Sequence, residues 1–135
     1  MSLRDNEGDA YSSEDVEVTA RLDIRQLRKD ILAKNGSFAL ISRDGKTVLP
    51  LEDGINTLGR LSRANNIVIK DKFCSALHAE LQIGEDGITI TDMGSTNGTF
   101  VNGNKITPIM SHPLQLGDEI TIGRSHFRIE VLLNE

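Results

Sequence analysis

The chain is poor in the residues that crosslink small domains or stack on nucleotide bases. Its single cysteine, Cys74, excludes a disulfide within the chain. It has no Trp, one Tyr and four Phe, so platforms for base stacking are scarce. No apolar run approaches the length of a membrane-spanning helix, and residues 1–15 are polar and acidic, unlike a signal peptide. We therefore expect no membrane partner and a cytoplasmic location.

The charge balance excludes further function classes. Asp and Glu number 20 against 15 Lys and Arg, which gives a formal net charge of −5 at pH 7. Binding to nucleic acid needs a basic surface that displaces counterions from phosphates, so we expect no nucleic-acid partner. The sequence also shows no nucleophile matched to a base, no carboxylate pair and no cluster with metal-ligand spacing. We therefore predict that the protein is not an enzyme and uses no metal or cofactor.

Length and pattern predict one all-β domain. A chain of 135 residues with 38% hydrophobic content can fill one core and is too short for two ordinary domains. Short apolar stretches are separated by turn signals such as Asp44-Gly45, Asp86-Gly87 and Asn102-Gly103. The expected strands are residues 38–42, 47–51, 55–58, 67–70, 79–83, 88–92, 99–101, 105–106, 119–122 and 126–132. Many short strands with no helix between them are typical of a sandwich or a barrel.

Three polar motifs lie between these strands. They are Gly59-Arg60, then Ser75-Ala76-Leu77-His78, then a turn-rich run from Asp92 to Gly103. Taken singly, each motif has an ordinary structural interpretation: the first as a strand end with a solvated side chain, the second as a local cap and the third as a tight turn. Gathered at one end of a sandwich, they supply a guanidinium, hydroxyls and an amide, which are groups that bind a phosphate. The set therefore indicates a phosphate-binding surface.

This combination resembles the forkhead-associated (FHA) domain, a β-sandwich of two antiparallel sheets whose loops at one end bind phosphothreonine in an extended peptide. The resemblance covers about residues 37–133, because Asn102-Gly103, Leu116-Gly117-Asp118 and Ile122-Gly123 continue it. It implies a flexible N-terminal tail at residues 1–36 and an FHA domain at residues 37–135. The implied site residues are Arg60, Ser75 and Thr96 at the phosphothreonine, Asn97 at the adjoining peptide main chain, and Gly59 and His78 as loop supports.

Two positions depart from the common family pattern. Many members carry a basic or amide residue after the motif serine, where this chain has Ala76, and a basic residue two positions before it, where this chain has Phe73. Lys72 and Arg63 are near enough in sequence to substitute. A charge-assisted hydrogen bond contributes about 1.5–3 kcal/mol, so losing one would weaken binding roughly ten- to a hundredfold.

The single cysteine, the histidines and one further loop are expected to play smaller parts in the site. Cys74 is predicted to be a half-buried side chain in the loop before the motif serine. We interpret His112 and His126 as incidental, and a metal role for His78 is disfavoured because no second ligand stands beside it. By resemblance, the loop from Val101 to Lys105 shapes selection of the third residue after the phosphothreonine.

Residues 1–36 have a different pattern. Apolar and polar residues alternate from Val16 to Ile24, which predicts an extended segment. Apolar residues then recur at helical spacing as far as Leu32, which predicts a short amphipathic helix that ends near Asn35-Gly36. Thr19 lies in the extended part, and its placement resembles small bacterial FHA regulators, in which a tail threonine phosphorylated by a Ser/Thr kinase folds back onto its own domain. The alternative is a disordered leader with a chance threonine.

Two function hypotheses follow. The first is a monomeric phosphothreonine-dependent protein-binding module that acts as a signalling adaptor or regulator, switched by phosphorylated Thr19. Its partners would be a phosphothreonine-containing protein or its own phosphorylated tail, together with a Ser/Thr protein kinase. The second hypothesis is a phosphate-independent scaffold or assembly domain, which is favoured by Phe73 and Ala76 at positions where basic or amide groups are frequent.

Overall fold

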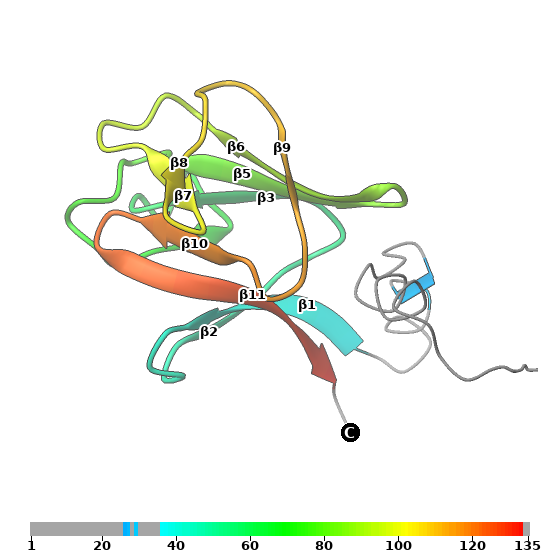
Figure 1. The fold of residues 1–135 in the computed structure, drawn as a ribbon. Coiled ribbons are helices and arrows are strands. Elements are labelled where there is room, and N and C mark those ends of the chain that lie inside the picture. Colours follow the sequence, from blue (N-terminus) through cyan, green and yellow to red (C-terminus); the bar gives the residue numbers. More distant parts are fainter. Residues whose placement is uncertain (1–25, 28, 30–35, 134–135) are drawn as a thin grey trace, which may run out of the picture.

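The structure of this protein is a computed structural model that describes residues 26, 27, 29 and 36–133. Most of the described chain consists of short strands joined by loops (Figure 1). The strands are β1 (Gly36–Ser42), β2 (Val48–Pro50), β3 (Gly54–Gly59), β4 (Ile67–Val68), β5 (Ala79–Gly84), β6 (Gly87–Asp92), β7 (Thr99–Val101), β8 (Asn104–Lys105), β9 (His112–Leu114), β10 (Glu119–Ile122) and β11 (Ser125–Leu133).

The strands form two sheets. One sheet has the order β2-β1-β11-β10-β7-β8, and the other has the order β4-β3-β5-β6-β9. Among the described strands the pairings are antiparallel except that of β3 with β4, which is parallel. The predicted all-β sandwich of two sheets is therefore confirmed.

The predicted strands agree with the observed ones except at the sheet edges. Strand β9, around Pro113, was not predicted, and the short β8 begins at Asn104 instead of Lys105. Proline cannot donate a ladder hydrogen bond and is tolerated on edge strands, which is where β9 lies, beside β6 only. Only Leu114 of the three β9 residues is buried, so the segment lacks the apolar alternation that marks a strand in sequence.

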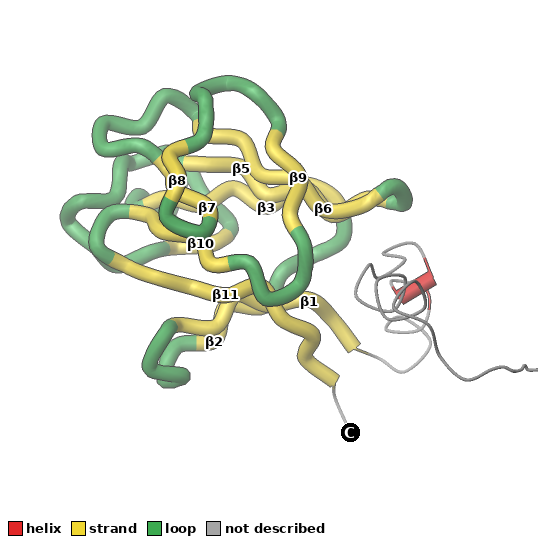
Figure 2. The backbone as a smooth tube through the Cα atoms, viewed as in Figure 1, coloured by secondary structure: helices red, strands yellow, loops and turns green. Residues whose placement is uncertain are grey.

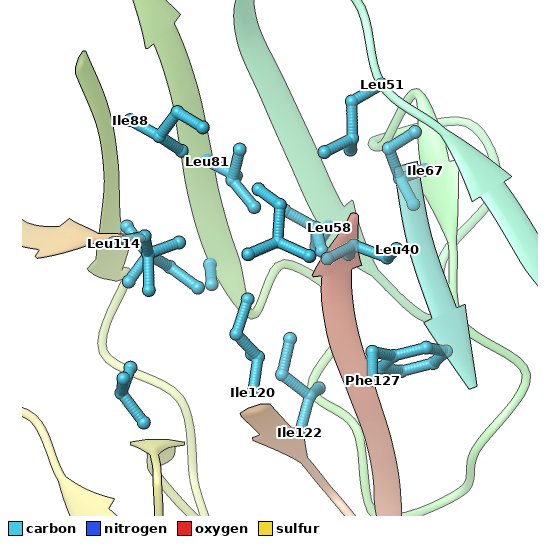
Figure 3. Close-up of a cluster of buried hydrophobic side chains, with 14 of the residues drawn as sticks. Leu40, Leu51, Leu58, Ile67, Leu81, Ile88, Leu114, Ile120, Ile122 and Phe127 are labelled. Carbon is cyan, nitrogen blue, oxygen red and sulfur yellow. The ribbon is translucent and has the colours of Figure 1, made fainter. Parts of the chain in front are cut away.

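The core lies between the two sheets. Leu58 and Leu81 from one sheet point toward Leu40, Ile120 and Ile122 from the other, and all five side chains are fully buried (Figure 3). The buried residues alternate along the strands, as in β6 and β10, so one face of each sheet supplies the core. Truncating one such Leu to Ala would cost about 2–5 kcal/mol of stability.

The hairpin between β7 and β8 shows how the turn residues act. Asn102 and Gly103 have φ values of 52° and 84°, the left-handed conformation that a two-residue turn of this kind requires at both positions. Asn and Gly adopt that conformation at lower cost than other residues, which is why the Asn-Gly pair was a hairpin signal.

The strand registers separate two ends of the sandwich. Residues Leu58, Ala79 and Asp92 stand in a row across β3, β5 and β6. In the other sheet Thr99 is paired with Ile122. The loops beyond these positions therefore share one end, which we call the loop end: residues 60–66, 69–78, 93–98 and 123–124 (Figure 2). We call the opposite end the turn end; it contains residues 85–86, 102–103 and 115–118.

Little of the N-terminal segment falls within the described residues. Gln26, Leu27 and Lys29 are helical, and Leu27 packs partly buried against the core cluster. Thr19, the predicted extended segment and the rest of the predicted helix lie outside the described residues. Within the described ranges, no helix is long and apolar enough to cross a membrane.

Candidate functional site

Arg60 follows the last residue of β3 and is exposed at the loop end. Its main-chain N–H donates to the Ser75 carbonyl oxygen at 3.0 Å, and its side-chain Nε donates to the Cys74 carbonyl oxygen at 3.0 Å. These bonds fix one edge of the guanidinium. The two terminal Nη groups have no hydrogen bond or ion pair with any residue between Gly36 and Leu133. Arg60 therefore presents an oriented pair of charged donors to solvent.

Ser75 and Thr96 come together from two different loops. The main-chain N–H of Thr96 donates to the Ser75 Oγ at 3.0 Å. The Ser75 hydroxyl donates to no described residue, so its hydrogen is available to donate outward. Thr96 is exposed, so its hydroxyl is accessible at the same place. Arg60 is joined to this pair through the Ser75 main chain.

Asn97 connects the same two loops. Its Nδ2 donates to the Phe73 carbonyl oxygen at 2.9 Å, so part of the amide that sequence reasoning reserved for a ligand is used within the protein. One Nδ2 hydrogen and the Oδ1 atom have no partner among the described residues. These are the groups of Asn97 that a peptide main chain could bond.

His78 lies beneath the loops and is fully buried. The Ser75 N–H donates to His78 Nδ1 at 3.0 Å, and Nε2 lies 2.9 Å from the Gly98 carbonyl oxygen. Since Nδ1 accepts, Nε2 must carry the hydrogen and donate to Gly98. The neutral imidazole therefore bonds the loop of residues 69–78 on one side and the loop of residues 93–98 on the other.

Gly59 is required by close packing. A Cβ at this position would collide with the Ala76 carbonyl oxygen and would lie 2.6 Å from Asn65 Nδ2. The Asn65 amide is itself held by bonds to the Leu61 carbonyl oxygen at 2.8 Å and the Ala76 carbonyl oxygen at 2.5 Å. The absence of a side chain at residue 59 thus allows the loop after β3 to lie against the loop before β5.

Asp92 organises the loop of residues 93–98, a role that the sequence analysis did not assign. Its Oδ2 accepts from the main-chain N–H groups of Gly94 and Ser95 at 3.1 Å each. Its Oδ1 accepts from the Ser95 hydroxyl at 2.5 Å and the Thr99 hydroxyl at 2.6 Å. Burial alone would raise the pKa of Asp92, but these hydrogen bonds, led by Ser95 and Thr99, hold it below its ordinary value. An Asp at a strand end with Gly-Ser two and three residues later is an Asx-turn signal, so this role was accessible from sequence.

Asp71 joins the turn between β10 and β11 to the loop that carries Ser75. Its Oδ2 accepts from the Arg124 N–H and the Ser125 hydroxyl, both at 2.7 Å, and its Oδ1 accepts from the Phe73 N–H at 2.7 Å. Burial would raise the pKa of Asp71, but the bonds from Ser125, Phe73 and Arg124 keep it below its ordinary value. A separation of 53 residues between Asp71 and Arg124 left no local signal for this contact.

Phe73 is flanked by two cations. The Arg124 guanidinium carbon lies 4.0 Å from the centroid of the Phe73 ring, and the Lys72 ammonium lies 5.5 Å from it. Lys72 is therefore near the position where a basic residue is common in the family. Among the described residues no hydrogen bond, ion pair or ring contact joins Arg63 to this loop, and Arg124 contacts the Phe73 ring instead.

Cys74 is fully buried, with 2% of its surface exposed, so the prediction of a half-buried side chain is wrong. The loop closes over it because Arg60 and Asn97 bond the carbonyl oxygens on either side of its peptide unit. Burial, reinforced by the nearby Asp71 carboxylate, raises the pKa of the Cys74 thiol to about 11.

The other two histidines stand apart from this arrangement. His112 is exposed at the start of β9, and His126 Nδ1 lies 2.9 Å from the Thr121 hydroxyl in the other sheet. In the part of the chain that the structure describes, no group of three or more His, Cys, Asp or Glu side chains could hold a metal ion.

The two-sheet sandwich and the anion-binding donors at its loop end define a protein-binding module with a site for a phosphorylated or acidic ligand. A family model supplies the assignment, because the model described as the FHA domain matches residues 56–123. The chain belongs to the FHA family.

Known proteins with similar sequences include two bacterial regulators. The chain is 40% identical to the oxoglutarate dehydrogenase inhibitor of Corynebacterium efficiens over 100 aligned residues. The alignment covers 72% of this chain and 66% of that protein. The chain is 35% identical to the glycogen accumulation regulator GarA of Mycobacterium tuberculosis over 72% of this chain and 58% of GarA. The chain thus spans less than two thirds of the length of these relatives. An FHA domain from a structural and functional analysis of phosphothreonine-dependent FHA interactions matches with a TM-score of 0.62 and 28% identity, over 70% of this chain and 95% of that one.

Proposed function

We propose that the protein is a phosphothreonine-dependent protein-binding module that acts as a signalling adaptor or regulator. In this proposal Arg60, Ser75 and Thr96 bind the phosphothreonine, Asn97 holds the adjoining main chain, and Gly59 and His78 support the loops. The supporting similarity is to FHA domains with phosphothreonine-dependent interactions and to bacterial regulators of the same family.

One observation carries the proposal. The Arg60 guanidinium is fixed through Nε to the Cys74 carbonyl oxygen, while both terminal Nη groups have no partner in the described chain. Ser75 beside it has a hydroxyl hydrogen to donate, because its Oγ accepts from Thr96 N–H and donates to no described residue. A phosphate monoester carries about −1.5 to −2 charges and three acceptor oxygens near neutral pH, and these donors match it.

The test is a titration of the unphosphorylated full-length chain with fluorescent phosphothreonine peptides, followed by anisotropy. We expect Arg60→Ala to weaken binding at least about a hundredfold, because two charge-assisted hydrogen bonds are lost. Arg60→Lys keeps the charge but lacks the planar guanidinium, so its affinity for the phosphothreonine peptide should lie between those of wild type and Arg60→Ala. Arg128→Ala removes an exposed arginine of β11 that pairs with Glu130, and it serves as the matched control.

Phosphoserine and unmodified versions of the same peptides complete the titration. Binding of the phosphothreonine peptide that is unchanged in Arg60→Ala would overturn the proposed site. Thermal unfolding of each variant separates a lost contact from a lost fold.

We further propose that residues 1–36 form a regulatory tail in which phosphorylated Thr19 binds the domain of residues 37–135 in the same molecule. Tethering through roughly twenty residues gives an effective concentration near millimolar, so even a modest affinity would close the site. A Ser/Thr protein kinase would supply the phosphate in the cytoplasm.

Competition for an external phosphothreonine peptide tests this switch. Phosphorylation at Thr19 should weaken binding of the external peptide at least about tenfold, and Thr19→Ala should abolish the effect of kinase treatment. Sedimentation should show a monomer before and after phosphorylation. A phosphorylation-dependent dimer, or no change in affinity, would contradict an intramolecular switch.

A phosphate-independent scaffold is the second candidate. Ile109 and Met110 are 66% and 61% exposed in the loop between β8 and β9. The N–H of Ile109 donates to the Asp92 carbonyl oxygen at 2.8 Å, which places this loop beside the loop end. Exposed apolar side chains of this size are often partner contacts. Complexes that survive phosphatase treatment but are lost on replacing Ile109 and Met110 with Ser would favour this candidate.

A further inference from the structure

We propose that a basic shelf formed by Lys72, Phe73 and Arg124 selects ligands that carry an acidic side chain close to the phosphothreonine. This inference rests on the proposed function, because it takes the phosphothreonine to lie at Arg60 and Ser75. In this proposal the turn between β10 and β11 contributes to ligand selectivity.

The main chain of the shelf is held in place. The Arg124 N–H donates to Asp71 Oδ2 at 2.7 Å, and the Ser125 hydroxyl donates to the same oxygen at 2.7 Å. Gly123 packs so closely that a Cβ there would lie 2.7 Å from Asp71 Oδ2. The β10–β11 turn is thus fixed against the loop of residues 69–78, and its Arg side chain starts from a defined position.

The cations of the shelf are oriented and form no direct ion pair among the described residues, although Arg124 lies near the Asp71 carboxylate. Arg124 stacks on the Phe73 ring at 4.0 Å, and Lys72 approaches the ring at 5.5 Å. Neither charged group has a hydrogen bond or salt bridge to any described residue. The Asp71 oxygens are occupied by two N–H groups and a hydroxyl instead. Stacking restricts the guanidinium without satisfying its donors, which leaves it ready to pair with a carboxylate.

The shelf is continuous with the proposed phosphate site. The carbonyl oxygen of Phe73 accepts from Asn97, and that of the next residue, Cys74, accepts from Arg60. The shelf and the phosphate donors therefore share one short segment of main chain. A peptide that reaches Arg60 would carry its neighbouring side chains past Phe73.

Charge complementarity identifies the ligand chemistry. The chain has a formal net charge of −5, yet Arg60, Lys72 and Arg124 are concentrated around residues 72–75. The segment before Thr19 contains the opposite charge, at Glu14, Asp15 and Glu17. An acidic phosphothreonine segment, of which this tail is one example, would thus pair with both the site and the shelf.

The experiment uses three synthetic peptides built on one neutral phosphothreonine sequence: one with Glu residues before the phosphothreonine, one with Glu residues after it, and one with Gln at all these positions. Anisotropy is measured with the unphosphorylated full-length chain at low and high salt. We expect one acidic peptide to bind about three- to tenfold more tightly than the Gln peptide at low salt. That gain should shrink at high salt and be lost in Arg124→Gln, with a smaller reduction in Lys72→Gln.

The variants are chosen to leave the fold and the phosphate contact intact. Arg124→Gln retains the main-chain N–H that bonds Asp71, and Arg128→Gln in the following strand β11 removes an equal charge away from the shelf. Equal binding of the three peptides, or a gain that persists in Arg124→Gln, would overturn the shelf while the proposed function stands. Failure of all three peptides to bind would overturn both.

Discussion

The two ends of the sandwich are stabilised in different ways. At the turn end, a local bond from the Gln115 N–H to Asp118 and the left-handed Asn102-Gly103 hairpin are supplemented by bonds of Asn102 with Asp118 and Glu119, 16 and 17 residues away. At the loop end, residues far apart bond one another: Thr96 reaches Ser75 across 21 residues, and Asn97 reaches Phe73 across 24.

Buried polar side chains are also unevenly divided. Among the described residues, Asn65, His78, Asp92 and Thr99 are buried at the loop end, while Asn56 is buried toward the turn end. Most of these buried polar atoms are hydrogen-bonded to loop main chain or to one another, whereas Asn65 Oδ1 is buried without a partner among the described residues. The loops that would bind a ligand are thereby fixed before the ligand arrives, which reduces the entropy lost on binding.

Replacing one carboxylate at each end should reveal the largest difference in stability between the two ends. Asp92→Asn replaces one of two acceptor oxygens by an NH₂ group, so either the N–H groups of Gly94 and Ser95 or the hydroxyls of Ser95 and Thr99 lose their acceptor, and we expect about 3 kcal/mol lower free energy of unfolding. Asp118→Asn removes a less buried carboxylate that accepts from the Gln115 N–H, and we expect the free energy of unfolding to fall by about 1 kcal/mol. Urea unfolding of both variants measures the difference. Equal losses would show that the two ends are supported alike.

A pair of glycine substitutions tests the close packing at the loop end. Gly59→Ala forces a Cβ against the Ala76 carbonyl oxygen and the Asn65 amide, and we expect about 2 kcal/mol of destabilisation together with weaker phosphopeptide binding. Gly84→Ala is the control, since its nearest neighbour, the Gly87 carbonyl oxygen, would lie 4.0 Å away. Its effect should be within about 1 kcal/mol of zero. A Gly59→Ala protein with normal stability and affinity would contradict the packing account.

Acid should act mainly through the loop end. Asp71 and Asp92 have folded-state pKa values below the ordinary 3.8, because hydrogen bonds outweigh the opposing effect of burial. Their contribution to stability is therefore complete above the unfolded pKa and is lost as the pH falls through the lower folded pKa. We expect the urea midpoint to fall below pH 4, and to fall less steeply in Asp92→Asn. Parallel acid profiles for wild type and variant would contradict this assignment.

The contrast between the ends also explains how much of the fold the sequence predicts. Turn signals such as Asn102-Gly103 act over a few residues, and apolar alternation along strands such as β6 reflects burial on one face, so both are visible in sequence. The edge strand β9 escaped prediction because Pro113 breaks the pattern and only Leu114 is buried. Its position depends on pairing with β6, which is a tertiary contact.

The candidate site likewise has features that local sequence predicts and features that depend on contacts between distant residues. Arg60, Ser75 and Thr96 were proposed from motifs, and the structure places them at adjoining loops. The contact between Asp71 and Arg124 could not be predicted, because no local pattern links two residues 53 positions apart. The burial of Cys74 depends on the same long-range closure of the loop and was missed for the same reason.

The most direct test of the account is an NMR titration of the unphosphorylated full-length chain with a peptide of residues 14–25 phosphorylated on Thr19, beside a degenerate phosphothreonine library. We predict saturable shifts of the main-chain amides of Arg60, Ser75, Thr96 and Asn97, with the amides of Glu85 and Asp86 at the turn end unchanged. Shifts with the library but not with the Thr19 peptide would retain the loop-end site and refute the tail as its ligand. No shifts at the loop end with either ligand would contradict the central claim.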